Sequence, residues 1–163
     1  MKRDVIEKYA AGGEKLSQAI RGLTREDLLW KPPADSPASI GKWSIQQVVI
    51  HLLDSDLIAM DRIKRMIAME NPQIIGYDEN LFIERLLPEE QSAEDAVKIL
   101  ELSFRNFANV LRKLPDAAFE RKGIHNERGA TTAGKYIEDM VAHMDRHLGF
   151  IHAKRAAMGK EMW

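Results

Sequence analysis

The sequence predicts an all-α protein, a four-helix bundle with short extra helices in its connectors, and three observations support this prediction. Four long segments repeat apolar residues with the spacing of a helix, and proline or glycine separates them. Runs of alternating β-branched residues and Asn-Gly or Asp-Gly hairpin turns are absent, so a sheet is not expected. Hydrophobic residues make up 45% of the 163 residues and charged residues 30%, which is typical of a globular chain that buries a core.

The first helix is expected from about Arg3 to Arg21, although Gly12 and Gly13 weaken its middle. In the connector that follows, Thr24 begins a short helical turn that ends at Trp30. Three prolines then exclude regular structure: Pro32, Pro33 and Pro37.

The second helix has the clearest start in the chain. Ser44 can cap it while the side chain of Gln47 reaches back, which is the pattern of a capping box. Trp43 and Val48 stand where a hydrophobic staple would fix the entry of the chain into the helix. The helix is expected to continue to about Met69, because an Asn-Pro pair follows.

The second connector is expected to contain a short helix over Glu79 to Leu87. A third long helix follows from Ser92 to about Leu114, with the serine as its cap. The stretch from Lys122 to Gly129 is interpreted as a loop.

The last helix is expected to begin at Thr131 or Thr132 and to end near Gly159. Four such helices favour a bundle, and one domain over residues 1–163 is expected. The two long connectors leave room for an arrangement in which consecutive helices are not simple up-and-down neighbours.

The chain carries a formal net charge of −1 and no cysteine. A near-neutral charge gives no general attraction to nucleic acid or anionic membrane, so neither is expected as a partner. No segment approaches the roughly 20 apolar residues that span a bilayer, and no signal peptide is evident, so a cytoplasmic location is expected. Without cysteine, any metal must be held by nitrogen and oxygen ligands.

Two histidines, His143 and His147, lie four residues apart in the last predicted helix. At this spacing the side chains lie about 40° apart around the helix axis, so both imidazoles can reach one metal. They flank the apolar stripe of that helix, and His51 flanks the stripe of the second predicted helix. Where these helices pack together, three imidazoles with an open fourth position would form a catalytic type of metal site.

An i,i+4 histidine pair is also compatible with two polar residues at the edge of an apolar stripe, one of them bonded to a neighbouring carboxylate. The zinc-peptidase pattern is excluded, because it needs a glutamate directly after the first histidine. Asp145 points about 200° away from His143 around the helix, so it cannot replace that glutamate as a general base.

The chain resembles the DinB/YfiT-like family of metal-binding four-helix bundles. The resemblance lies in the segment Gly41–Leu52 (GKWSIQQVVIHL) and in the histidine pair near the C-terminus. The segment Leu23–Leu28 (LTREDL), the proline-containing connector after it, and a loop histidine, His125, ahead of Gly129 also fit. The similarity extends over nearly the whole chain.

The resemblance implies a DinB-like variant of the up-and-down bundle, with a divalent metal at His51, His143 and His147. Zinc is the first expectation for the metal, with nickel or iron as alternatives. The implied activity is that of a metal-dependent enzyme, either an S-transferase that uses a low-molecular-weight thiol or a hydrolase-like enzyme. A small-molecule substrate and a homodimer are implied as well.

Further site candidates are His125, as a substrate contact or proton carrier, and Tyr136, which shares the flank of the histidine pair. Ser55 could support the site from behind His51, whereas His152 faces elsewhere on its helix. The competing hypothesis is a non-catalytic metal-binding bundle that acts as an interaction or regulatory module. A third is a bundle that has lost its metal. An open coordination position facing a pocket would distinguish an enzyme from a structural metal site.

Overall fold

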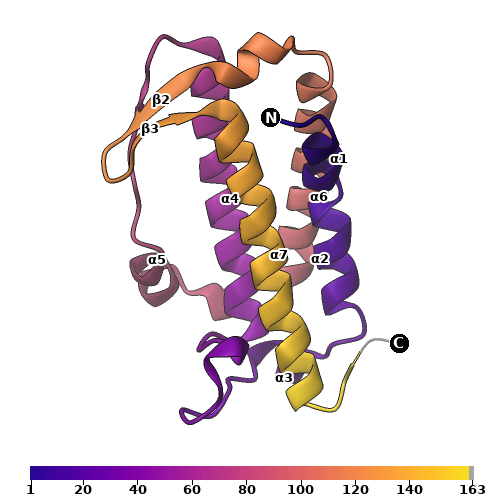
Figure 1. Ribbon diagram of the computed structural model, residues 1–163. Coiled ribbons are helices and arrows are strands. Elements are labelled where there is room, and N and C mark those ends of the chain that lie inside the picture. The colour runs from indigo at the N-terminus through magenta and orange to yellow at the C-terminus, as the bar shows by residue number, and fades with distance from the viewer. Residues whose placement is uncertain (162–163) are drawn as a thin grey trace.

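Four helical rods form the body of the molecule (Figure 1), which confirms the predicted all-α bundle. The computed structural model describes residues 1–161, so Met162 and Trp163 of the predicted domain lie outside the described residues. The rods are α1 (Asp4–Ala10) with α2 (Gly12–Ile20), α4 (Ile45–Ala68), α6 (Ala93–Leu111) and α7 (Ala133–Ala157).

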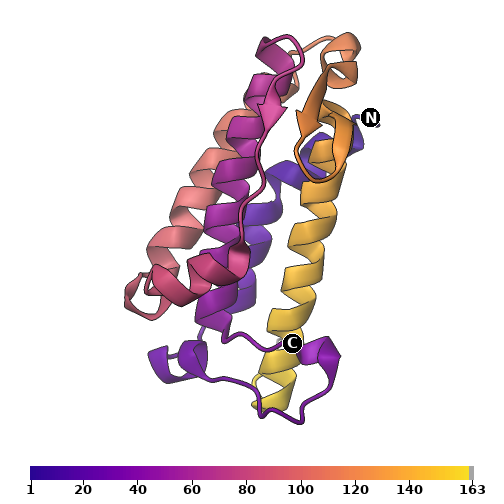
Figure 2. The same cartoon turned by 90° about the vertical axis from the view of Figure 1, so that its left-hand side faces the viewer.

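Rods that are consecutive in the sequence are not all neighbours in the bundle. The α1–α2 rod packs against α6 and α7, and α4 packs against the same two helices, so the first two rods lie on a diagonal. Helices α4 and α6 are neighbours that run in the same direction, and the connector between them descends the length of the bundle (Figure 2). The long connectors therefore serve an arrangement other than simple up-and-down neighbours.

The first rod is interrupted at Ala11, where the prediction had one continuous helix. The two glycines that follow have a packing role. A Cβ atom at Gly13 would lie 2.6 Å from the Cα of Glu101 in α6, and one at Gly12 would lie 3.0 Å from the Phe104 ring. Glycine at these positions lets α2 approach the backbone of α6 closely.

The capping box predicted at Ser44 is present, and the helical turn predicted at Thr24 also begins with a capping box. Thr24 and Asp27 form one at the start of α3 (Arg25–Leu29). In the other, the Ser44 hydroxyl accepts from the Gln47 amide N–H at 3.1 Å, and the Gln47 side chain accepts from the Ser44 N–H at 3.0 Å. A short 3-10 helix, η1 (Ala38–Ile40), lies between α3 and α4.

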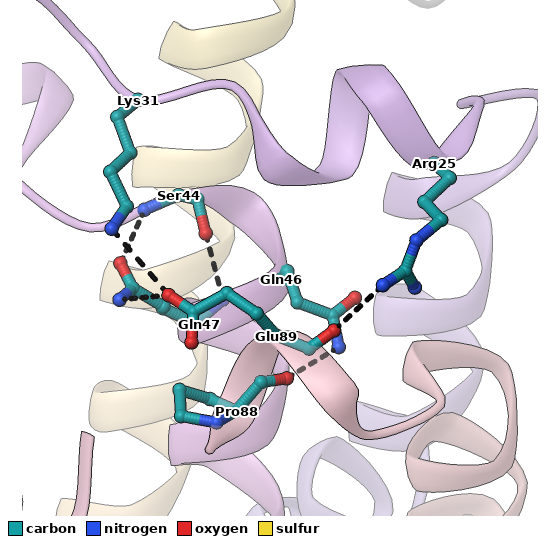
Figure 3. Close-up of polar contacts among 7 residues, drawn as sticks. All are labelled: Arg25, Lys31, Ser44, Gln46, Gln47, Pro88 and Glu89. Carbon is teal, nitrogen blue, oxygen red and sulfur yellow. Dashed lines mark hydrogen bonds and ion pairs between the residues drawn. The ribbon is translucent and has the colours of Figure 1, made fainter. Parts of the chain in front are cut away.

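Polar contacts fix the base of α4 to the second connector (Figure 3). The Gln47 amide donates to the Glu89 carboxylate at 2.9 Å, and the Arg25 guanidinium donates to the Glu89 carbonyl at 3.0 Å. Gln46 donates to the Pro88 carbonyl at 2.9 Å. Both acceptor residues belong to the 3-10 helix η2 (Pro88–Glu90), so the lower end of the connector is held against the helix that carries His51.

The second connector contains the predicted short helix as α5 (Glu79–Arg85), and Ser92 caps α6 as predicted. After α6 the chain forms η3 (Asp116–Glu120). Thr132 caps α7, and Gly159 ends it with a φ of 67°.

A small three-stranded sheet covers one end of the bundle, so the expectation of no sheet and of a loop over Lys122 to Gly129 was wrong. Its strands are β1 (Gln73–Ile74), β2 (Lys122–His125) and β3 (Gly129–Thr132). β1 pairs with β2 in parallel, and β2 pairs with β3 antiparallel. The hairpin turns through three residues before Gly129, whose φ is 74°, so it lacks the two-residue turn that marks a hairpin in a sequence.

The bundle core is apolar and continuous. It combines residues from all four rods, among them Leu16, Ile63, Leu100 and Ile137, each fully buried. Within the described part of the chain, no helix combines the length and the apolar character needed to cross a membrane.

Candidate metal centre

The seam between α4 and α7 brings three imidazoles together. His51 comes from the second turn of α4, and His143 and His147 come from the middle of α7. Each offers one ring nitrogen to a group whose nitrogens all lie within 4.8 Å of one another. His51 and His147 are buried, with 2% and 7% of their surface exposed, and His143 is partly buried.

The spacing of the ring nitrogens suits a tetrahedral metal. The Nε2 atoms of His51 and His143 lie 3.2 Å apart. Two nitrogens bound to one zinc ion at about 2.0–2.1 Å in tetrahedral geometry would stand roughly 3.3 Å apart. The residues present therefore fit a divalent cation.

Buried nitrogens without partners also fit a metal centre. The Nδ1 atoms of His143 and His147 have no hydrogen-bond partner among residues 1–161. A buried polar atom without a partner costs free energy, so such atoms are uncommon away from functional sites. Two buried ring nitrogens without partners in one cluster are therefore typical of a functional site.

Aromatic rings restrict the orientation of the imidazoles. The Trp43 ring lies 4.9 Å from the His51 ring, centroid to centroid, and is nearly parallel to the His147 ring at 6.4 Å. Phe150 meets His147 edge-on at 5.5 Å. Trp43 thus contacts the site, in addition to its expected part at the start of α4.

The three imidazoles are held in the neutral form that a metal requires. Burial is the largest cause in each case, and it lowers the pKa of His51 to about 3, that of His143 to about 4 and that of His147 to about 2. The positive charge of Arg146 acts in the same direction on all three pKa values, and neighbouring imidazoles do so for His51 and His147. At neutral pH the ring nitrogens therefore keep free lone pairs for a cation.

Glu79, the first residue of α5, brings a carboxylate to the same point. Its Oε2 lies 3.7 Å from the Nε2 of His51, the nitrogen that also faces His143. Its side chain is half exposed, so it can reach both the histidines and solvent. A carboxylate in this place could act as a fourth ligand or as a proton acceptor.

A cavity of about 700 Å³ opens beside His143, and we name it the His143 cavity. It lies between α4, α7, the hairpin and the second connector. The residues of its wall that carry functional groups include Arg62, Tyr77, Glu79, His125, Tyr136 and His143. This volume is within the range of small-molecule binding sites.

The predicted candidates His125 and Tyr136 both line the His143 cavity, although neither belongs to the metal-ligand group. His125 ends strand β2, is buried, and accepts a hydrogen bond at Nδ1 from the Glu127 amide at 3.2 Å. Burial and the nearby Arg128 and Arg62 charges lower its pKa, so the ring is neutral and its remaining proton is on Nε2. The Tyr136 hydroxyl accepts from Arg62 at 2.7 Å.

Two further residues were considered in the sequence, Ser55 and His152. Ser55 is buried and lines the His143 cavity, one turn beyond His51. His152 is exposed and lies outside the metal-ligand group.

Sequence reasoning missed several residues around the histidines. Glu79 and Arg128 reach the site from the connector and the hairpin turn. No spacing pattern links these segments to His143. Arg146 could have been found, because it lies three residues after His143 and therefore near the same helix face.

Comparison with known families gives a match over most of the chain. Residues 9–151 match the DinB superfamily. A protein of Oceanobacillus iheyensis that bears the name "Putative metal-dependent hydrolase" is 33% identical over 136 residues, which are 83% of this chain and 75% of that relative. A second relative, the "Putative metal-dependent hydrolase YfiT" of Bacillus subtilis, is 28% identical over 156 residues. These are 95% of this chain and 83% of that relative.

A solved structure has the same architecture. It is described as "YfiT from Bacillus subtilis is a probable metal-dependent hydrolase with an unusual four-helix bundle topology". The two chains superpose with a TM-score of 0.85 at 27% sequence identity, over 97% of this chain and 88% of that one.

Proposed function

Because this chain belongs to the DinB superfamily, we propose that it is a metal-dependent enzyme that acts on a small molecule bound in the His143 cavity. The observation that carries the proposal is the meeting of three neutral imidazoles, two of them buried, with the third, His143, in the wall of a large cavity. His51, His143 and His147 would hold the ion through their ring nitrogens. A divalent ion held there would act as a Lewis acid and lower the pKa of a bound water or thiol.

The protein's own residues divide the remaining work. Glu79 would accept the proton of the nucleophile at Oε2, since this atom is already 3.7 Å from a ligand nitrogen. His125 would donate from Nε2 to an oxygen of the substrate. The Arg62–Tyr136 pair would fix a polar group of the substrate, since both residues line the cavity and hold each other in place.

The identity of the nucleophile separates two reaction classes. The names of the relatives support water, and therefore hydrolysis. The resemblance to thiol-using members of the family supports a low-molecular-weight thiol, and therefore S-transfer. The thiol would have to come from a substrate, because the chain has no cysteine.

The proposal includes three further properties. Zinc is the first metal to test, followed by nickel and iron, because nitrogen ligands suit all three. The enzyme would work in the cytoplasm and as a homodimer, as the resemblance and the composition led us to expect. The alternative of a non-catalytic module predicts a closed metal site, and the cavity of about 700 Å³ beside His143 supports the enzyme instead.

The test compares two assays on zinc-loaded protein. One follows hydrolysis of activated esters, and the other follows transfer of a small thiol to an electrophile such as chlorodinitrobenzene. We expect activity in at least one assay, loss to background in His143→Ala, and normal activity in His152→Ala, a histidine of the same helix outside the site. Activity that survives in His143→Ala would contradict the proposal.

The proton-acceptor role of Glu79 has its own test. General-base catalysis contributes about 10²–10⁴-fold, so we expect Glu79→Gln to lose about 10²-fold or more in kcat while it keeps its metal. Glu84→Gln, in the same short helix, is the control and should match the wild type. If Glu79→Gln retains full kcat, Glu79 has no part in proton transfer.

A further inference from the structure

The wall of the His143 cavity carries more positive than negative charge. Its cationic side chains outnumber its carboxylates four to two; they are Arg62, Arg128, Lys135 and Arg146, against Glu79 and Asp139. The whole chain, by contrast, has 24 Lys and Arg against 25 Asp and Glu. Cations are therefore concentrated at this cavity, where low-dielectric walls strengthen their effect on an anion.

Two of the four cations are already engaged. Lys135 pairs with Asp139 on the same helix. Arg62 donates to the Tyr136 hydroxyl and to the Ile75 carbonyl, which ties α4 to α7 and to the connector.

The other two, Arg128 and Arg146, are uncompensated. Neither forms an ion pair or a side-chain hydrogen bond with any residue between 1 and 161. Both are exposed on the cavity wall, so an anion can reach them from solvent. A guanidinium presents a planar fork of donors that suits a carboxylate or a phosphate group.

The turn that carries Arg128 has a fixed backbone position. The turn is fastened to β1, because the Asn126 side chain accepts from the Gly76 amide at 2.8 Å and the Asn126 amide donates to the Ile74 carbonyl at 3.0 Å. Arg128, His125 and His143 all line the His143 cavity, so the guanidinium belongs to the same wall as these two rings.

We infer that the His143 cavity binds a small molecule with a carboxylate or phosphate group, and that Arg128 is the principal contact for this anion. The rest of the molecule extends from Arg128 toward His143 and Glu79. This inference deepens the proposed function by naming a substrate class, and it rests on that function for the role of the histidines. The anion contact itself requires no metal.

The probes are succinate, inorganic phosphate and succinamide, the neutral analogue of succinate. Each is titrated into the full-length protein, metal-free and zinc-loaded, while amide NMR signals of the hairpin are followed. We expect at least one anion to bind to saturation and succinamide to bind at least tenfold more weakly. The anion that binds more tightly identifies the substrate's charged group as carboxylate or phosphate.

Arg128→Gln should weaken anion binding at least tenfold in both metal states. Arg105→Gln removes the same charge from the exposed face of α6 and should stay within twofold of the wild type. Both positions are exposed, so thermal unfolding should match the wild type and show that the variants are folded. Unchanged anion affinity in Arg128→Gln, equal binding of succinamide, or no binding of either anion would overturn the inference.

Metal content measured on the same samples separates the two proposals. Normal zinc uptake together with anion binding that does not depend on Arg128 would remove the anion site and leave the metal-dependent enzyme standing. Anion binding that depends on Arg128 in a protein that takes up no metal would remove the proposed enzyme mechanism instead.

Discussion

At the scale of single residues, Asp56 is a buried carboxyl group outside the histidine site. It lies on the core side of α4 with 2% of its surface exposed. Its Oδ2 and the hydroxyl of Tyr9 have no hydrogen-bond partner in the described part of the chain. Both line a small cavity of about 10 Å³, which is close to the space that one water molecule needs.

Burial raises the pKa of the Asp56 carboxyl well above its ordinary value. The folded protein therefore holds this proton more tightly than the unfolded chain does. The protonated carboxyl contributes stability below the unfolded pKa of 3.8, and this contribution is lost as the pH rises toward the folded pKa.

Asp56→Asn should remove this pH dependence. Between pH 4 and pH 8, the free energy of unfolding of the metal-free wild type should fall relative to the variant. Each unit by which the folded pKa exceeds the unfolded pKa corresponds to about 1.4 kcal/mol. Urea unfolding at several pH values measures the difference, and Tyr9→Phe, which keeps the carboxyl, should keep the wild-type dependence. Parallel stability curves for wild type and Asp56→Asn would show that the carboxyl does not titrate in this way.

For single site residues, the sequence predicted positions correctly where the residues share one helix, because helix geometry relates their side chains. The spacing of His143 and His147 and their place beside an apolar stripe predicted that both would face a neighbouring helix. Glu79 could not be found in this way, because its approach to His51 depends on the path of the connector between α4 and α6. Such a path depends on tertiary packing, which no local pattern records.

At the scale of secondary-structure elements, caps predicted helix starts well. Thr24, Ser44, Ser92 and Thr132 each accept a hydrogen bond from the backbone three residues on, as the sequence led us to expect. The sheet was missed because β1 and β2 are two and four residues long and pair across about fifty residues of chain. Strands of this length carry too few residues for an alternating pattern to appear.

The contact between α2 and α6 depends on Gly13. A Cβ atom there would lie 2.6 Å from backbone, which cannot move aside like a side chain. Gly13→Ala should therefore lower the free energy of unfolding by about 1–3 kcal/mol through overpacking.

Gly149→Ala is the matched control for this prediction. Gly149 is an exposed residue of α7, and a Cβ atom there would meet nothing within 4 Å among residues 1–161 apart from its chain neighbours and the adjacent backbone of its own helix. Alanine should stabilise this helix position by about 0.5–1 kcal/mol. Equal effects of the two substitutions in denaturant unfolding would show that α2 and α6 are not in close contact.

At the scale of the whole molecule, the arrangement of the rods accounts for the position of the site. Because α4 and α6 run in the same direction, the chain must return along the bundle between them, and this return carries α5 past the seam of α4 and α7 (Figure 2). The small sheet closes the upper end of the His143 cavity through Ala130 and Thr131. The small sheet and the path of the second connector, which the sequence did not predict, therefore help to give the histidines a cavity.

In the sequence, the two long connectors indicated that the rods would not pack in simple up-and-down order. Their length, rather than their composition, showed that consecutive rods need not be neighbours. The final pairing of the α1–α2 rod with α6 and α7 follows from which apolar faces pack together, and Gly12 and Gly13 contribute to it by their lack of side chains. The similarity to the solved YfiT structure, with a TM-score of 0.85, shows the same bundle.

The most direct test of the account is the metal content of protein purified without added metal and without a histidine tag. Wild type and His152→Ala are expected to carry one equivalent of a divalent metal per chain, and His51→Ala is expected to have lost it. A wild type that takes up no metal after reconstitution with zinc, nickel and iron, or a His51→Ala variant that keeps its equivalent, would contradict the three-histidine centre.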